Sequence, residues 1–388
     1  MVRLYRQGKS IRSIATQFQV DKKTVKKWID YAGNKRLDRV DFSDKRKSQP
    51  KVPHNKLAPE VERCIIQTRL WLRQTSDLGE YGAKAIRQQM KSNGCSCLPS
   101  ERAINYVLER YGLQNQYRRQ RFLPPPAGWY LPEVCSKEQE MDCFDHIEDL
   151  RIQGTLEDFS VFNATSLHGS LACSWIDKQV TSNCVAEHII ERFKRFGRPA
   201  YAQFDNALVF RGPHKPDCLG LVTRVCLELN INVVFTIPCD TGPQAKIERY
   251  NKQWKDSVWN RFCFENLQQL QIQSERFVEA YRQKHKNEIA HAPTRQPVPL
   301  DWEPSFPTQV TGKVIYLRRT DDYGQVNILG QVRTVHPTLT QQLVRCEVDL
   351  TQGQIVYYRL HRRRVFDNEV ITIVPYEFPC RKFKPCKR

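Results

Sequence analysis

The sequence has no stretch that approaches about 18 consecutive apolar residues, so it predicts no membrane-spanning helix and no membrane partner. Its first residues, Met1 to Gln7, lack the apolar run of a secretory signal peptide. No two of its 14 cysteines form a Cys-x-x-Cys pair, and Cys95 and Cys97 have no second pair at zinc-finger spacing. We therefore expect a cytoplasmic protein with free thiols, in which any bound metal is a hard cation held by carboxylates.

Charge is distributed unevenly along the 388 residues, which have a formal net charge of +19. Residues 1–130 carry a net charge of +16, residues 131–260 carry −4, and the remainder carries +7. Basic flanks around an acidic middle suit a protein whose ends bind phosphates while its centre collects cations. A basic chain alone also fits a ribosomal protein, so the charge indicates a nucleic-acid partner without specifying it.

Residues 1–33 have the pattern of a helix-turn-helix domain. Ser10 can cap one helix, and Asp21 can cap the next, whose apolar stripe includes Val25 and Trp28. The exposed face of this last helix carries Lys22, Lys23, Lys26 and Lys27. An apolar back and a basic front are what a recognition helix in the major groove needs, so we expect these lysines to contact DNA. The alternative is a solvated basic helix in another three-helix unit.

A polar, basic and proline-containing stretch over 34–56 predicts a linker, and a second helical, helix-turn-helix-like domain follows over 57–116. Apolar residues recur at helical spacing at Val61, Ile65, Ile66, Trp71, Ala85, Ile86 and Met90. Ser100 can cap a third helix that ends at Gly112. Two such units in tandem would read a longer DNA site, but a packing domain without DNA contact fits as well.

A basic, proline-rich connector over 117–134 leads to a segment, 135–295, in which strands and helices alternate. The expected strands lie around 140–145, 159–164, 170–176, 200–205 and 233–237, and the expected helices around 185–193, 221–229 and after Pro243. Three strands, helix, strand, helix, strand, helix is the order of an RNase H-like α/β domain. The predicted fold is thus multidomain α/β, with this domain as its catalytic core.

After Pro307 the hydrophobic pattern becomes alternating, with turn residues around Asp321 and Gly353. Several short strands over 308–370 predict a small C-terminal β-barrel. Residues 371–388 form a basic tail.

Three acids of the middle segment are placed to hold metal ions. Two divalent cations about 3.5–4 Å apart can activate a nucleophile and stabilise the leaving oxygen of a phosphodiester. Their ligands must come from separate elements: Asp142 begins the first strand, Asp205 ends a later one, and Glu248 lies on the following helix. Glu248 shares a helix face with Gln244, Lys252 and Lys255, which could hold DNA phosphates. Taken alone, this face also fits a solvated helix with a Glu–Lys pair.

The acids lie in the segments Glu-Met-Asp142-Cys, Gln-Phe-Asp205-Asn-Ala-Leu-Val-Phe and Gly-Pro-Gln-Ala-Lys-Ile-Glu248-Arg-Tyr-Asn-Lys. With the helical units before them and the barrel after them, almost the whole chain resembles the retroviral-integrase superfamily, especially bacterial insertion-sequence transposases with an Asp-Asp-Glu triad. The resemblance implies that the three acids are catalytic and bind two Mg²⁺ or Mn²⁺ ions. It also implies that Gln244, Asn251 and Lys252 contact the transposon end.

Two features depart from the family pattern. Forty-two residues separate Asp205 from Glu248, and Ala207 stands where many relatives have glycine.

The first acid could be either Asp142 or Asp145. The two are three positions apart, so in a regular strand they point to opposite faces and only one can join the site. We choose Asp142 because its context matches the family, and a bulge would reverse that choice.

The resemblance implies a transposase or integrase that binds double-stranded transposon ends, processes their 3′ ends and joins them to target DNA. It also implies a nucleoid-associated homo-oligomer, and an ATPase helper is possible for this family. The alternatives are a catalytically silent DNA-binding regulator derived from a transposase and a nuclease without transfer activity.

Overall fold

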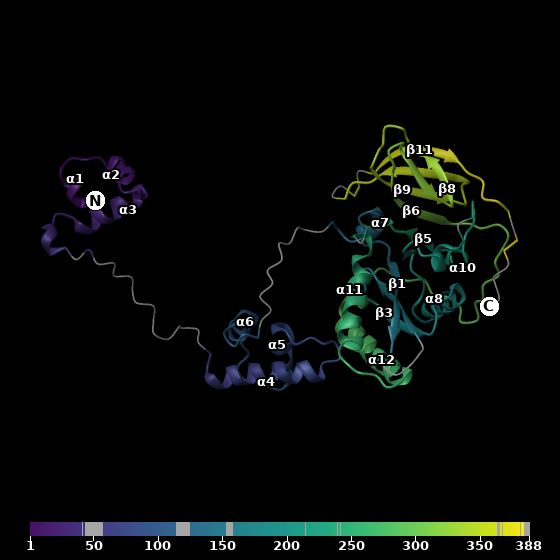
Figure 1. Ribbon diagram of the computed structural model, residues 1–388, viewed down its shortest axis with the longest axis horizontal. Helices are drawn as coiled ribbons and strands as arrows, with labels where there is room; N and C mark the ends of the chain where they lie inside the picture. Colours follow the sequence, from purple (N-terminus) through teal and green to yellow (C-terminus); the bar gives the residue numbers. More distant parts are fainter. Residues whose placement is uncertain are drawn as a thin grey trace. The chain divides into compact units, whose positions relative to one another are not determined.

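The computed structural model describes residues 1–40, 42, 57–113, 125–152, 158–213, 215–238, 240, 242–362, 365–366, 368–380 and 382–383 (Figure 1). The chain forms two compact units, Met1–Arg63 and Cys64–Arg388. The predicted linker, connector and basic tail lie partly outside the described residues. Within the described part of the chain, every helix is too short or too polar to span a membrane.

The N-terminal unit contains three short helices, α1 (Val2–Arg6), α2 (Ile11–Gln17) and α3 (Lys22–Ala32), and a 3₁₀ turn, η1 (Leu37–Arg39). The predicted caps are confirmed, because Ser10 Oγ accepts from the Ser13 amide at 3.2 Å and Asp21 Oδ1 accepts from the Lys23 amide at 2.7 Å. Ile14, Ala15 and Val25 form the buried core. The four lysines of α3 are exposed, as predicted, and the DNA-binding role of this unit stays a prediction.

Three further helices follow, α4 (Pro59–Thr75), α5 (Ala83–Ser92) and α6 (Glu101–Arg110). Ser100 caps α6, since its hydroxyl accepts from the Ala103 amide at 3.2 Å. The helix predicted from Val61, Ile65, Ile66 and Trp71 is α4, on which Ile65 and Leu72 are buried and Trp71 is 49% exposed.

The middle of the chain contributes five strands, in the spatial order β3-β2-β1-β4-β5, to a mixed sheet, and the order of strands and helices along the chain agrees with the prediction. The strands are β1 (Met141–Arg151), β2 (Asp158–Ser166), β3 (Ala172–Asp177), β4 (Tyr201–Phe204) and β5 (Asn232–Phe235). β1, β2 and β3 pair antiparallel, whereas β4 is parallel to β1 and β5 is parallel to β4. The short helix α7 (Pro132–Cys135) precedes β1.

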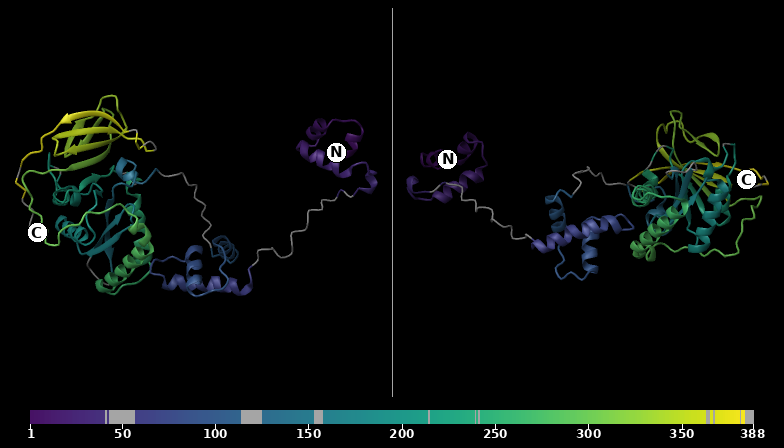
Figure 2. Two further views of the ribbon diagram at one scale, coloured as in Figure 1. Left: turned by 180° about the vertical axis from the view of Figure 1, so that it is seen from behind. Right: turned by 60° about the horizontal axis from the view of Figure 1, so that its bottom comes forward.

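Helices cover both faces of this sheet (Figures 1 and 2). One face packs against α8 (Ser182–Phe196) and α10 (Leu221–Glu228), with α9 (Leu208–Arg211) between them in the sequence. The other face packs against α11 (Ala245–Trp254) and α12 (Leu267–Lys284). The remaining elements here are η2 (Gly242–Gln244), the π-helical turn η3 (Lys255–Trp259) and α13 (Lys286–Ala290). Alternate residues of β1 therefore enter different cores, Phe144 on the α8 face and Cys143 on the α11 face.

The C-terminal strands extend the same sheet, so the predicted separate β-barrel over 308–370 is not confirmed. These strands are β6 (Lys313–Arg319), β7 (Gln325–Ile328), β8 (Gln331–Thr334), β9 (Leu343–Asp349), β10 (Gln354–Arg359) and β11 (Glu369–Pro375). β6 pairs parallel with β5, and the sheet continues through β9 and β10 to β11, while β7 and β8 form a separate hairpin. The reason is that β6 is buried on both faces: Val314, Ile315, Tyr316 and Leu317 are each at most 2% exposed. A strand that is apolar on both faces is stable in the middle of a sheet, where other strands pair with it on both sides and both of its faces are covered.

Candidate active site

Asp142 lies in β1 with its side chain fully buried between two arginines. Arg192 Nε donates to Oδ2 at 2.8 Å, and Arg295 donates to Oδ1 at 2.9 Å and to Oδ2 at 2.8 Å. Burial by itself would raise the pKa of Asp142, but the charges and hydrogen bonds of the two arginines lower that pKa well below its ordinary value. Both oxygens are engaged in the interior, on the α8 face of the sheet, so the surroundings of Asp142 do not suit the predicted role of metal ligand.

Asp145 lies level with Asp205 on the neighbouring parallel strand. In the β1–β4 pairing Asp142 is opposite Ala202 and Cys143 is opposite Gln203. Counting three positions on from Asp142 and from Ala202 leads to Asp145 and to Asp205, which directly follows the end of β4. Neighbouring strands are about 4.8 Å apart, and the alternation of side chains places both acids on the α11 face. Unlike Asp142, both are only partly buried.

Glu248 reaches the same place from α11. The pKa of Asp145 is raised to about 6. Burial is the largest cause, and the charges of Asp205 and Glu248 raise the pKa further, while His146 lowers it. The pKa of Glu248 is raised as well, by burial and then by Asp240. Asp145 from β1, Asp205 after β4 and Glu248 from α11 thus interact electrostatically on one face of the sheet, and a metal site at these acids stays a prediction.

Two asparagines hold Asp145 in position. Asn251, three residues after Glu248 on α11, donates from Nδ2 to Asp145 Oδ2 at 2.7 Å. Asn163, opposite Asp145 on β2, donates to Asn251 Oδ1 at 2.8 Å. The Asn251 side chain is therefore occupied within the chain, and this arrangement does not show the DNA contact that was predicted for it.

The turn after β4 fixes Asp205 without a glycine. Asp205 Oδ1 accepts from the Ala207 amide at 2.8 Å, and Ala207 has a φ of −61°, which alanine adopts without strain. Asn206 donates to the Thr236 carbonyl at 2.7 Å and accepts from Arg318 Nη2 at 2.8 Å. The alanine that departs from the family pattern therefore fits this turn.

The other predicted DNA-binding residues of this region lie along the helix that carries Glu248. Lys252 and Lys255 are exposed, the latter at the start of the π-helical turn. Gln244 precedes α11, and its buried Nε2 has no hydrogen-bond partner among the residues that the structure describes. Asp240, whose charge acts on Glu248, is bound by Arg362 at 2.8 Å. The places of Asp240, Asn163 and Arg362 beside the predicted acids follow no pattern in the sequence.

No protein-family model matches the chain. No curated protein sequence matches it significantly either. Its fold is similar to that of the catalytic core domain of BIV integrase, at 16% identity and a TM-score of 0.27 over 36% of this chain and 80% of that one.

Two further solved structures are similar to the chain. The first is from the simian T-cell lymphotropic virus intasome, solved with a PP2A regulatory subunit, at 13% identity and a TM-score of 0.32 over 76% of this chain and 99% of that one. The second is the HTLV-2 integrase catalytic core domain with magnesium, at 12% identity and a TM-score of 0.28 over 41% and 86%. At identities and TM-scores this low, function has to be inferred from the geometry of the chain itself.

Proposed function

We propose that this chain is a metal-dependent DNA transposase or integrase whose catalytic carboxylates are Asp145, Asp205 and Glu248. The proposal is supported by the placement of these acids: Asp145 and Asp205 belong to neighbouring strands, and Asn251, on the helix of Glu248, donates a hydrogen bond to Asp145. Carboxylate oxygens are the ligands that Mg²⁺ and Mn²⁺ prefer. Repulsion from the other two acids contributes to the raised pKa of Asp145, and bound cations would relieve that repulsion.

The chain's own residues would position both the acids and the DNA. Asn251 and Asn163 orient the carboxylate of Asp145, and the Ala207 amide orients that of Asp205. Lys252 and Lys255 lie exposed on the helix of Glu248, where they can bind phosphates of the DNA end. Bound divalent cations would activate water or a 3′-hydroxyl as nucleophile and stabilise the leaving oxygen.

Asp142 has a positioning role in this proposal. Its two arginines come from α8 and from the segment after α13, so the buried carboxylate joins β1 to both. Asp142 is therefore expected to stabilise the strand that carries Asp145 rather than to bind the cation.

The lysines of α3 should supply sequence-independent DNA affinity. Replacement of Lys23 and Lys26 by alanine should weaken binding and reduce the dependence of log K on log salt by about 0.9 for each phosphate that the protein no longer neutralises. Fluorescence anisotropy at several salt concentrations measures this slope. The matched control is Lys286→Ala, which changes an exposed lysine on α13, and an unchanged slope in the Lys23/Lys26 variant would contradict phosphate contacts by α3.

The test of the proposed function is a strand-transfer assay. DNA from the borders of the protein's own coding region serves as donor and supercoiled plasmid as target, with Mg²⁺ or Mn²⁺, and Asp205→Asn is run in parallel. Joined products from the wild type alone are expected. Nicks without joining would favour a nuclease, and binding without cutting under either metal would favour a DNA-binding regulator.

A further inference from the structure

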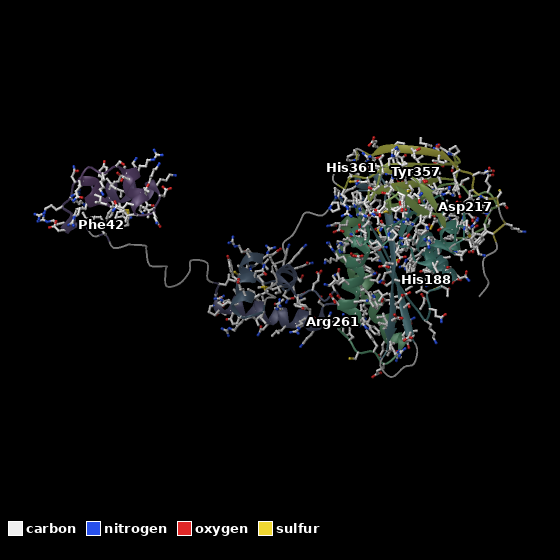
Figure 3. All side chains as sticks on the ribbon, turned by 45° about the horizontal axis from the view of Figure 1, so that its top comes forward. Phe42, His188, Asp217, Arg261, Tyr357 and His361 are labelled. Carbon is white, nitrogen blue, oxygen red and sulfur yellow. The ribbon has the colours of Figure 1, made fainter. Side chains whose placement is uncertain are left out.

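Three side chains that the proposed function does not use meet on the α8 face of the sheet. Asp177 ends β3, while Cys184 and His188 lie one helical turn apart on α8 (His188 is labelled in Figure 3). His188 Nε2 lies 2.9 Å from Asp177 Oδ2 and 3.3 Å from Cys184 Sγ. The three potential ligand atoms all lie within 4.8 Å of one another. A carboxylate, a thiol and an imidazole are thus directed at a common point.

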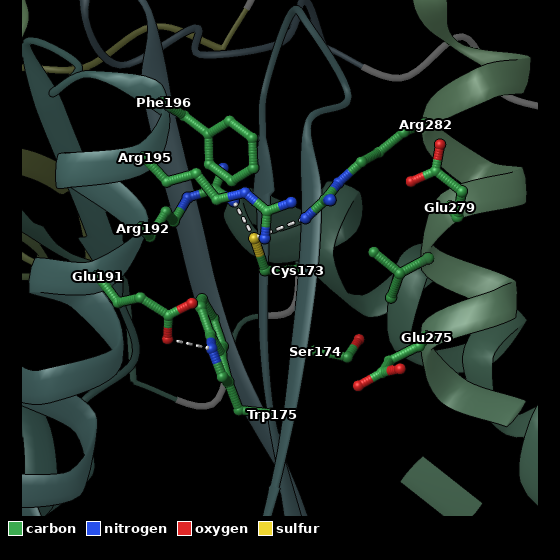
Figure 4. A pocket seen from close by; sticks show the side chains of 11 residues that line it. Cys173, Ser174, Trp175, Glu191, Arg192, Arg195, Phe196, Glu275, Glu279 and Arg282 are labelled. Atoms are coloured by element: carbon green, nitrogen blue, oxygen red, sulfur yellow. Dashed lines mark hydrogen bonds between the residues drawn. The ribbon is translucent and has the colours of Figure 1, made fainter. Parts of the chain in front are cut away.

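A second layer of contacts holds the imidazole. His188 Nδ1, on the other side of the ring, lies 4.0 Å from Glu191 Oε2. That same carboxylate oxygen accepts a hydrogen bond from Trp175 Nε1 at 3.0 Å (Figure 4). The Trp175 ring also stacks on the His188 ring, with centroids 5.0 Å apart and planes 18° apart. At 4.0 Å the Glu191 carboxylate is not hydrogen-bonded to the ring, but it lies on the side where a carboxylate commonly supports a metal-binding histidine.

We infer that Asp177, Cys184 and His188 form a binding site for a zinc ion. Zinc prefers nitrogen and sulfur ligands, with bonds of about 2.0–2.3 Å, which place tetrahedral ligand atoms about 3.4–3.6 Å apart. His188 Nε2 needs to move only about half an ångström farther from Asp177 Oδ2, and less from Cys184 Sγ, to reach that spacing. A fourth position is left for water. Mg²⁺ and Mn²⁺, which suit the Asp145 site, bind thiolate and imidazole less well.

The location of the ligands favours metal binding. In the metal-free chain, burial and the neighbouring Asp177 raise the pKa of the Cys184 thiol, so a cation has to displace the thiol proton when it binds. The side chains of Asp177 and His188 are 24% and 19% exposed, so a cation has a path from solvent to the site. The site lies on the α8 face, whereas Asp145 and Glu248 lie on the α11 face.

A zinc ion here would stabilise the catalytic core. It would join the end of β3 to the start of α8, and α8 carries Arg192, which pairs with Asp142 in β1. Binding to the folded chain alone raises its stability by mass action. Zinc should therefore raise the unfolding temperature of the metal-free chain.

The experiment uses the full chain, stripped of metal with a chelator and titrated with Co²⁺ as a spectroscopic substitute for zinc. We expect a saturable thiolate-to-cobalt charge-transfer band at one equivalent, which added zinc removes. Because this readout uses the wild type, it does not depend on whether a variant folds. Cys184→Ser should lose the band, whereas the matched control Cys263→Ser, which changes an exposed cysteine, should keep it.

Two results would overturn the inference. One is a wild-type chain that shows no thiolate band and no zinc-dependent rise in unfolding temperature. The other is a band that persists in Cys184→Ser. Asp205→Asn should retain the band in full, so loss of DNA joining and loss of zinc binding are separable outcomes.

Discussion

Replacement of Asp145 by asparagine should reduce DNA joining by about 10³-fold or more while the chain remains folded. Asparagine has the shape of aspartate and can still accept the hydrogen bond from Asn251, so the packing is preserved. It carries no charge, however, and cannot replace the carboxylate as a ligand of two cations. The strand-transfer assay measures the loss, and DNA affinity measured in parallel should be unchanged.

The matched control for this variant is Glu148→Gln, which removes an exposed acid of the same strand that pairs with His146. It should join DNA at the wild-type rate. Joining by Asp145→Asn at a rate near that of Glu148→Gln would contradict the assignment of Asp145 as a ligand.

The raised pKa of Asp145 gives this variant a second readout without DNA. In the folded chain the pKa of Asp145 is about 6, above the ordinary value of 3.8. The protonated carboxyl group therefore stabilises the folded chain most below pH 4, and this stabilisation is lost as the pH rises through about 6. Relative to Asp145→Asn, the metal-free wild type should therefore lose about 3 kcal/mol of stability between about pH 3 and pH 7, a range that extends beyond both pKa values. Denaturant unfolding at several pH values measures the difference.

Replacement of Asp142 by asparagine should affect stability far more than chemistry. The change leaves Arg192, which is fully buried, and Arg295, which is 12% exposed, without their shared counter-charge. Removal of one partner of a buried ion pair typically costs about 3–5 kcal/mol, because the remaining charge stays uncompensated. The free energy of unfolding, from urea or guanidinium titration, should fall by about that amount.

An exposed pair provides the comparison for Asp142→Asn. Asp158 accepts two hydrogen bonds from Arg151 with both side chains more than half exposed, so Asp158→Asn should leave the free energy of unfolding nearly unchanged. The Asp142→Asn variant should still join DNA detectably when it is assayed at a temperature where it is folded. A stable Asp142→Asn protein that joins no DNA would restore Asp142 as the ligand.

Local signals in the sequence are sufficient to predict much of the fold. Ser10, Asp21 and Ser100 are expected to cap helices, and each does so through its own side chain. The order of strands and helices from β1 to α11 also follows from hydrophobic periodicity and turn residues. These features depend on residues close together in the chain.

Features that depend on distant residues are not predictable in this way. The alternation of side chains shows that Asp142 and Asp145 face opposite sides of the sheet, but not which side carries α11. That choice depends on the pairing of β1 with β4 and on Arg192 and Arg295, which lie 50 and 153 residues away. The pairing of β6 with β5 is likewise a contact between distant segments, although the run from Val314 to Leu317 indicates a strand buried on both faces.

The most direct test of the account is to map where the cation binds. Fe²⁺ in place of Mg²⁺, with ascorbate and peroxide, cleaves the backbone next to bound iron, and mass spectrometry locates the cuts. We expect cuts near Asp145, Asp205 and Glu248 that Mg²⁺ suppresses and that disappear in Asp145→Asn. Mg²⁺-sensitive cuts that persist in Asp145→Asn, or that lie elsewhere in the chain, would contradict it.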